Sequence, residues 1–186
     1  MDKTKALQNL KDSIACIKKN KLKYFIIDGT LLGAIREGDF IEHDTDIDIG
    51  VFMEEWSIIT LSDILVDFME KGFILYHSFG IFGKHFELSW MRDGIKVDFF
   101  FYYKHEDKIR FNAFLNGGRN IETDLLTYEY PAENFDNLIK YYFNGLEVII
   151  PDDPKRILEI KYGKDWETPR KRWCWANDPK NKVCSK

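Results

Sequence analysis

The sequence has few cysteines, and their arrangement suggests no function. Cys16, Cys174 and Cys184 form an odd, widely spaced set that fits neither a zinc-binding pattern nor a disulfide framework. The chain also lacks a run of about 18 apolar residues, the minimum for a membrane span. Its first residues lead into an amphipathic stretch rather than the apolar centre of a signal peptide. We therefore expect no transmembrane segment and a cytoplasmic location.

An excess of positive charge is also missing. Lysine and arginine number 27 against 31 acidic residues, a formal net charge of -4, so no basic surface indicates a nucleic-acid partner. Hydrophobic residues make up 45% of the chain and aromatic residues 16%, which excludes a disordered protein. With no linker or repeat in its 186 residues, the chain is predicted to form a single domain over residues 1–186.

The hydrophobic pattern predicts an α+β fold. Helical spacing of apolar residues, helped by the glycines that follow, favours helices over 4–19, 31–35, 54–71 and 154–160. Short apolar or alternating runs favour strands over 24–27, 46–52, 73–78, 85–91, 95–103, 108–115, 141–143 and 146–150. Strands in the second half follow one another through turns such as Asp93-Gly94, which indicates mostly antiparallel pairing.

The most informative segment is the acidic run at the start of the expected strand 46–52. Residues two apart on a strand share a face, so Asp46 and Asp48 point one way while Ile47 and Ile49 point into the core. Adjacent carboxylates repel one another, and a divalent cation removes that cost. Mg²⁺ is the expected ion, with Mn²⁺ as the alternative, and Asp44 joins the acidic face if the strand begins early.

A third acid, Asp98, stands among strongly apolar residues of the expected strand 95–103. If that strand lies beside the strand 46–52, Asp98 completes a three-carboxylate cluster able to hold metal and to serve a reacting hydroxyl. Simpler explanations remain for each acid alone. An isolated Asp-x-Asp is usually a solvated strand face, and Asp98 by itself could be a charge that protects a sheet edge.

Gly29 and Thr30 follow a buried strand and precede a short helix. Backbone N–H groups at such a position can bind a phosphate. The alternative is a plain strand-to-helix turn, which either interpretation requires. Together with the downstream acids, the segment favours a site for a phosphorylated ligand.

The chain resembles the LicD/fukutin family of the nucleotidyltransferase superfamily. The resemblance rests on the run Asp28-Gly29-Thr30-Leu31-Leu32-Gly33-Ala34-Ile35-Arg36, on Asp44-Thr45-Asp46-Ile47-Asp48, on Asp98, and on Lys161-Tyr162-Gly163-Lys164-Asp165-Trp166 with Pro169 and Trp173. It covers roughly residues 24–175. The sequence departs from the family at Glu42-His43, where many members have a proline and an aromatic residue.

The resemblance implies a nucleotidyltransferase-like mixed β-sheet with flanking helices. It also implies transfer of a phospho-alcohol group, such as phosphocholine or ribitol phosphate, from a CDP-linked donor to a hydroxyl of a glycan or lipid-linked glycan, with release of CMP. Asp46 and Asp48 would then bind Mg²⁺, with Asp44 as a further ligand, and Asp98 would share a metal or accept the proton of the acceptor.

Two basic residues are candidate phosphate ligands under the same resemblance. Arg36 has a planar fork that suits phosphate, although a salt bridge with Glu37 or Glu42 is equally expected. Lys161 lies near a predicted helix end, where a lysine is favoured in any case.

Two rival functions use the same residues. A nucleotidyltransferase would attach a nucleoside monophosphate to a small molecule and release pyrophosphate. A non-catalytic nucleotide-binding module would keep the fold without the reaction. Three clustered carboxylates argue against it, because a site without catalysis need not keep them together. His85 and Glu87 alternate on the strand 85–91 and could face the same cleft, although a structural role is favoured for the histidine. A base or sugar could stack on the aromatic residues of the late segment, which could equally pack the C-terminal tail onto the domain: Trp166, Trp173 and Trp175.

Overall fold

The computed structural model describes residues 1–170 and 172–183. Its α-helices are α1 (Lys3–Lys19), α2 (Asp28–Arg36), α3 (Ile58–Glu70), α4 (Ile121–Asp124) and α5 (Pro154–Tyr162). Its strands are β1 (Tyr24–Ile26), β2 (Asp46–Phe52), β3 (Ile74–Ile81), β4 (His85–Arg92), β5 (Ile95–His105), β6 (Lys108–Phe114), β7 (Leu125–Pro131), β8 (Leu138–Phe143) and β9 (Leu146–Pro151). Cys16 and Cys174 are free thiols, and Cys184 lies outside the described residues.

The main sheet has the order β1-β2-β5-β4-β3, and β6 and β7 continue from the far end of β5. β2 and β5 run parallel, while the other neighbouring strands are antiparallel. β8 and β9 form a separate hairpin. The predicted α+β class is therefore confirmed, and the parallel β2–β5 pair makes the sheet mixed.

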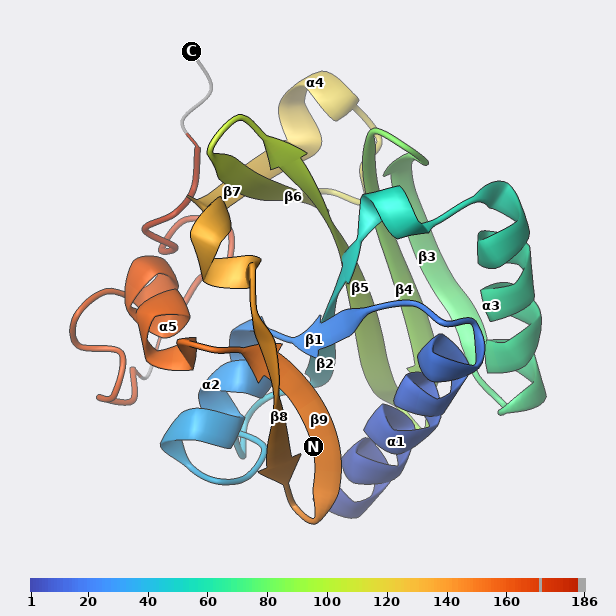
Figure 1. Ribbon diagram of the computed structural model, residues 1–186, viewed down its shortest axis with the longest axis horizontal. Helices are drawn as coiled ribbons and strands as arrows, with labels where there is room; N and C mark the ends of the chain where they lie inside the picture. Colours follow the sequence, from blue (N-terminus) through green and yellow to red (C-terminus); the bar gives the residue numbers. More distant parts are fainter. Residues whose placement is uncertain (171, 184–186) are drawn as a thin grey trace.

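Helices cover both faces of the sheet (Figure 1). On one face, α1 and α3 pack against the central strands, and Phe68 of α3 stacks on Trp90 at 4.4 Å and meets Phe99 edge-on at 5.4 Å. On the other side of the sheet lie α2 and α5. Ile47 and Ile49 of β2 are fully buried in the core, as predicted. The acidic residues that alternate with them consequently face α2.

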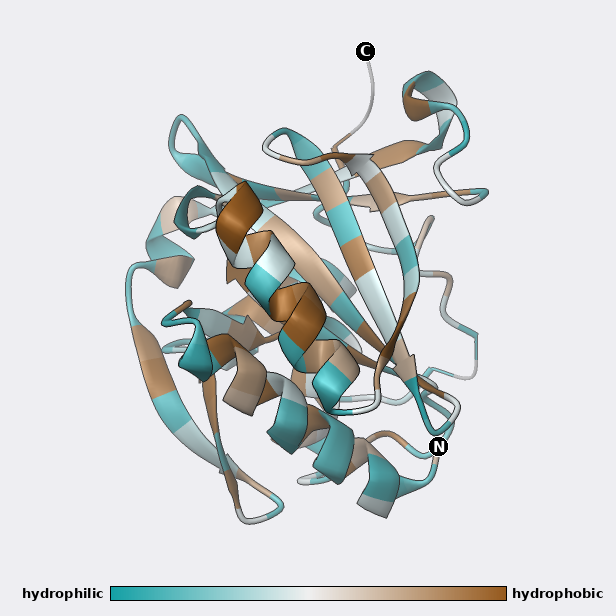
Figure 2. Cartoon of the chain, turned by 90° about the vertical axis from the view of Figure 1, so that its right-hand side faces the viewer, coloured by the Kyte–Doolittle hydropathy of each residue, from teal (hydrophilic) through white to brown (hydrophobic). Residues whose placement is uncertain are grey.

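The outer surface of α3 and the edge strand β3 is unusually apolar. Figure 2 shows brown, hydrophobic positions along α3 on the side turned to the viewer. The exposed residues on these two elements are Ile58, Ile59, Val66, Met69, Ile74, Leu75, Tyr76 and Ile81. Of these two elements, α3 lies on the opposite side of the sheet from the acidic residues, because its Phe68 packs against Trp90 and Phe99. Among the described helices, none combines the length and the apolar character that crossing a bilayer requires.

Two predicted helices need correction, and one strand was missed. The helix expected over 54–71 is divided, because a 3₁₀ turn over Met53–Glu55 ends at Trp56 and Ser57 then caps α3 through Thr60 N. α2 begins at Asp28, three residues earlier than expected. β7 was not predicted, although its buried residues alternate as a strand requires.

Candidate functional site

The start of α2 is held by an acid that lies far away in the sequence. The residue before this helix, Ile27, offers no capping side chain. Instead, the Asp48 carboxylate accepts hydrogen bonds from Gly29 N at 2.9 Å and Thr30 N at 3.3 Å. Thr30 Oγ1 in turn accepts a hydrogen bond from Asp48 N at 2.8 Å. The predicted turn over residues 28–30 is thus the first turn of the helix, and its N–H groups already have a partner.

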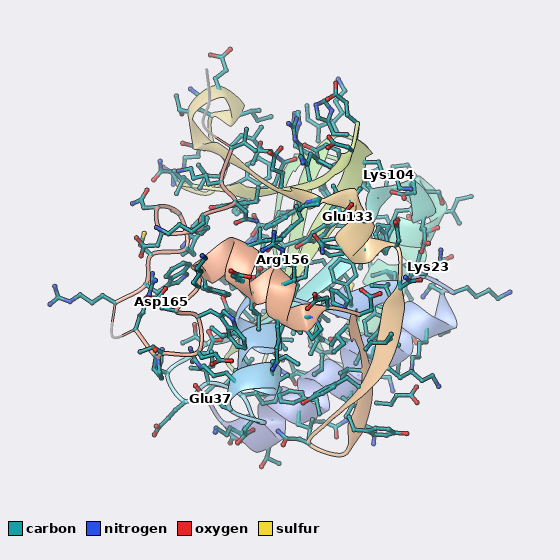
Figure 3. The ribbon with its side chains drawn as sticks, turned by 60° about the vertical axis from the view of Figure 1, so that its left-hand side comes forward. Lys23, Glu37, Lys104, Glu133, Arg156 and Asp165 are labelled. Carbon is teal, nitrogen blue, oxygen red and sulfur yellow. The ribbon has the colours of Figure 1, made fainter. Side chains whose placement is uncertain are left out.

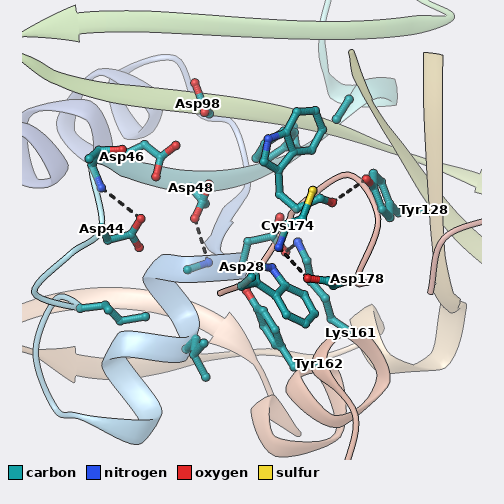
Figure 4. Close-up of a pocket in the computed structure, with 18 of the residues that line it drawn as sticks. Asp28, Asp44, Asp46, Asp48, Asp98, Tyr128, Lys161, Tyr162, Cys174 and Asp178 are labelled. Carbon is teal, nitrogen blue, oxygen red and sulfur yellow. Dashed lines mark hydrogen bonds and ion pairs between the residues drawn. The ribbon is translucent and has the colours of Figure 1, made fainter. Parts of the chain in front are cut away.

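The structure brings the three predicted acids together. In the parallel pairing of β2 and β5, Asp48 stands opposite Asp98. One carboxylate oxygen from each of Asp46, Asp48 and Asp98 lies within 4.8 Å of the other two. Figure 4 shows these side chains converging above α2, with Asp44 beside them. Strand periodicity and the order of the motif correctly placed this cluster.

Asp44 lies just before β2 and over the start of α2. A Cβ atom built on Gly29 would come within 2.6 Å of Asp44 Oδ2 and 3.1 Å of Asp48 Oδ2. The two carboxylates therefore approach the backbone closely at Gly29, and a side chain at this position would displace the Asp44 carboxylate from its place over the helix.

Burial and mutual repulsion make these acids hard to ionise. Burial, reinforced by Asp46, raises the pKa of Asp44 to about 7. The same two causes, burial and then Asp46, hold the pKa of Asp48 well above its ordinary range. Burial also raises the pKa of Asp98, to about 6, although Lys96 and Ser89 limit the rise. The cluster is therefore short of positive charge.

Lys96 supplies part of that charge from within the sheet. Its ammonium group lies 2.7 Å from Asp98 Oδ2 and 3.3 Å from Asp46 Oδ2. Burial alone would lower the pKa of Lys96, but the carboxylates of Asp98 and Asp46 outweigh it and raise that pKa. Lys96 is thus held as a cation between two acids of the cluster. Lys96 was not among the predicted site residues, although its position two residues before Asp98 on one strand implies a shared face.

On its other side Asp98 is linked to β4 and β3. Ser89 Oγ donates a short hydrogen bond to Asp98 Oδ1 and lies 2.6 Å from His77 Nε2. Glu87 Oε1 is 3.2 Å from the same nitrogen. His77 and Ser89 were missed because their meeting with Asp98 depends on the register of three strands. Of the two predicted cleft residues on β4, Glu87 lines the cavity above the acids and His85 does not.

A cavity of about 760 Å³ opens above the acids. Its wall opposite the sheet is formed by α2, α5 and the chain after α5 (Figure 4). Its aromatic and basic lining includes Arg36, Lys161, Tyr162, Trp166, Arg170, Arg172, Trp173 and Trp175. Glu37 and Asp165, by contrast, lie on the outer surface of this side of the molecule (Figure 3). The cavity therefore combines acids on one wall with cations and aromatic rings on the other.

The two predicted phosphate ligands on this wall are both paired with acids. Lys161 forms a buried ion pair with Asp28 at the start of α2. Arg36 forms the salt bridge with Glu37 that was considered as the alternative, at 2.7 Å, and also donates to Trp166 O at 3.4 Å. Both residues line the cavity as well. Their pairing with acids therefore leaves open whether they also bind phosphate.

Comparison with known proteins identifies the family. The model for the "LicD/FKTN/FKRP, nucleotidyltransferase domain" matches residues 21–153. The chain belongs to this LicD/FKTN/FKRP family. It is 31% identical over 166 residues to human "Ribitol-5-phosphate transferase FKTN", covering 89% of this chain and 34% of that protein. It is also 32% identical over 165 residues to an uncharacterised protein of Rickettsia typhi, covering 86% of this chain and 46% of that one.

The chain thus spans about a third of the length of the FKTN proteins it matches. A solution structure of the antibiotic-resistance factor ANT(2'')-Ia aligns with 94% of this chain and 78% of its own, with a TM-score of 0.53 and 12% sequence identity. That likeness concerns the fold alone and agrees with the expected nucleotidyltransferase-like architecture.

The acids of this LicD-family chain fit a divalent cation. Oxygen ligands from Asp46, Asp48 and Asp98 lie within reach of one ion, and carboxylate oxygens are the ligands that Mg²⁺ prefers. The raised pKa values of Asp44 and Asp48 show a shortage of positive charge that such an ion would relieve.

Proposed function

We propose that this chain transfers a phospho-alcohol group, such as ribitol phosphate or phosphocholine, from a CDP-linked donor to a hydroxyl of a glycan or lipid-linked glycan. One observation carries the proposal: carboxylates suited to metal line a cavity of about 760 Å³ in a chain 31% identical to a protein named a ribitol-5-phosphate transferase. A nucleoside diphosphate carries negative charge that a metal ion and basic residues can offset.

In this proposal Asp46 and Asp48 hold Mg²⁺ or Mn²⁺, with Asp44 as a further ligand. The ion would neutralise the donor's diphosphate and stabilise the departing CMP. Asp48 is especially well placed for this task, because Gly29, Thr30 and the strand backbone fix its carboxylate before any ligand arrives. Such preorganisation is the main source of rate in phosphoryl transfer.

Asp98 is the proposed general base. The acceptor hydroxyl would attack the β-phosphorus, the one that bears the alcohol, and the bond from that phosphorus to the bridging oxygen would break. CMP leaves with the bridging oxygen, and the hydroxyl proton passes to Asp98. The base must be ionised to accept it, and the pKa of Asp98, raised to about 6, leaves it mostly ionised near neutral pH.

The opposite wall would bind the nucleotide part of the donor. Arg36 and Lys161 bring positive charge to the cavity, and we assign them to the phosphates together with Gly29 and Thr30. Because the N–H groups of Gly29 and Thr30 bind Asp48 in this structure, they would act on the phosphates through that carboxylate. Trp173, which packs against Tyr162 at 4.8 Å, offers a ring face to a base or sugar.

The test is a screen of CDP-linked and other nucleotide donors with Mg²⁺, followed by product analysis. A phospho-alcohol product with CMP is expected. Asp46→Asn and Asp48→Asn should reduce turnover at least 10²-fold while the far-ultraviolet circular dichroism spectrum stays unchanged, in line with the usual size of such electrostatic losses. Asp93→Asn, in the exposed β4–β5 turn, is the matched control and should be fully active.

Two outcomes would overturn the proposal. A nucleoside monophosphate attached to the acceptor, with release of pyrophosphate, would establish the rival nucleotidyl transfer. Donor binding that is independent of divalent cations and unaffected by Asp48→Asn would instead favour a non-catalytic binding module.

A further inference from the structure

The acid cluster is unevenly supplied with positive charge. Lys96 contacts Asp98 and Asp46 at one end of the cluster. Within residues 1–170 and 172–183, no other lysine, arginine or histidine nitrogen forms an ion pair with Asp44, Asp46, Asp48 or Asp98. The Asp48 end is held instead by the uncharged backbone N–H groups of Gly29 and Thr30. A side-chain cation is therefore placed at the Asp46–Asp98 end of the cluster, while at the Asp44 end the amino group of Met1 donates to Asp44 O at 3.1 Å.

The position of Lys96 follows from the sheet itself. Lys96 is the register partner of Asp46 in the parallel β2–β5 pair, and Asp98 is two residues farther along β5 on the same face. Its side chain is only 27% exposed, and that of Asp98 is 4% exposed. Solvent therefore competes weakly for this ion pair, unlike a pair on the open surface. The ammonium group occupies space between two carboxylates that a metal ion would need in order to bridge them.

We propose that Lys96 is a built-in cation that keeps divalent metal away from the Asp46–Asp98 side, so that the chain holds one ion, on the Asp46–Asp48 side. This inference rests on the proposed function, from which the presence of one bound ion is taken. It assigns Asp98 to the acceptor hydroxyl, because the Asp98 carboxylate already contacts the Lys96 ammonium group and the Ser89 hydroxyl.

Lys96 would also act on the donor. A fixed ammonium group beside Asp98 contributes positive charge that a second metal ion would otherwise supply to the diphosphate. Lysine can do so as a compact point charge on a flexible stem. Removing that charge should open the Asp46–Asp98 side to a metal ion, since Asp46 and the buried Asp98 then lack the ammonium group that lies between them.

The test counts Mn²⁺ ions bound to the full chain, by electron paramagnetic resonance of free Mn²⁺ during titration. The wild-type protein is expected to bind one ion. Lys96→Met, which keeps the length of the side chain but removes its charge, should bind a second ion. Lys96→Arg, which keeps the charge, should bind one. Equal counts and equal affinities for the wild type and Lys96→Met, including no binding by either, would overturn the proposal.

A folding control accompanies the titration, because Lys96→Met leaves Asp98 buried without its partner. Circular dichroism identifies any unfolded variant. Lys96→Gln is the substitute in that case, since its amide still donates a hydrogen bond, and the same additional ion is expected. The Mn²⁺ count does not depend on turnover. A donor screen without any product would therefore count against the proposed function alone.

Discussion

At the scale of single residues, Thr30 shows how a helix start and a strand fix one carboxylate. Its hydroxyl accepts the hydrogen bond of Asp48 N, and both groups are buried. Thr30→Val preserves the shape but leaves that N–H group without a partner, which should lower the free energy of unfolding by about 1–3 kcal/mol. Mn²⁺ affinity should fall as well, because Asp48 loses its fixed position. Urea unfolding and Mn²⁺ titration measure the two effects.

Thr30→Ser is the matched control for this prediction, because it keeps the hydroxyl and removes only a methyl group. It should retain Mn²⁺ affinity close to that of the wild-type protein. If Thr30→Val and Thr30→Ser have equal affinities, the hydroxyl has no part in positioning Asp48.

At the scale of secondary-structure elements, the buried pair Asp28–Lys161 joins α2 to α5. Lys161→Met leaves Asp28 charged and buried without a partner, which should cost about 3–5 kcal/mol. The double variant Asp28→Asn/Lys161→Met removes the stranded charge and should recover most of that loss; Asn also tolerates the positive φ of 51° at this position. Lys164→Met, at an exposed neighbour, should change little. Urea unfolding of these variants tests the pair, and equal losses for both lysine substitutions would contradict it.

The same scale shows which parts of the fold were predictable. Local patterns correctly indicated β2, β5 and the shared face of Asp46 and Asp48, because alternation on a strand is a property of neighbouring residues. The start of α2 was predicted three residues too late, because its N–H groups are capped by the Asp48 carboxylate and the preceding residue offers no capping side chain. The contact of His77 with Ser89 depends on pairing across strands, which one sequence does not specify. β7, by contrast, was missed although its buried and partly buried residues alternate, a local pattern that favours a strand.

At the scale of the whole molecule, one buried core joins the sheet to its helices, and we infer a single domain that unfolds as one unit. Without metal, its stability should fall as the pH rises from about 4 to about 7, because the pKa values of Asp44 and Asp98, at about 7 and about 6, are raised in the folded state. Those two acids bind protons more tightly when folded, so their contribution is complete at low pH and is lost as they ionise. For Asp98 alone, a pKa raised from 3.8 to about 6 corresponds to about 3 kcal/mol.

Acids with lowered pKa values act in a different range. Hydrogen bonds from Asn120 and Arg170 lower the pKa values of Asp124 and Asp165 respectively. Their contribution is present above the ordinary pKa of aspartate and is lost only as the pH falls below it. The decline between pH 4 and pH 7 therefore reports on the candidate metal site and not on the surface.

Divalent metal should reverse that decline, because it binds the ionised carboxylates. At a metal concentration about 100 times the dissociation constant, binding adds about 2.7 kcal/mol, which raises the melting temperature of a domain of this size by about 5–10 °C. Thermal unfolding in EDTA and in Mg²⁺ from pH 5 to pH 8 measures this, and the gap between the two curves should widen with pH. Asp98→Asn should flatten the EDTA curve, since it removes one titrating acid. Equal melting temperatures in EDTA and Mg²⁺ at pH 8 would show that these acids do not bind the ion, whatever the reaction of the chain.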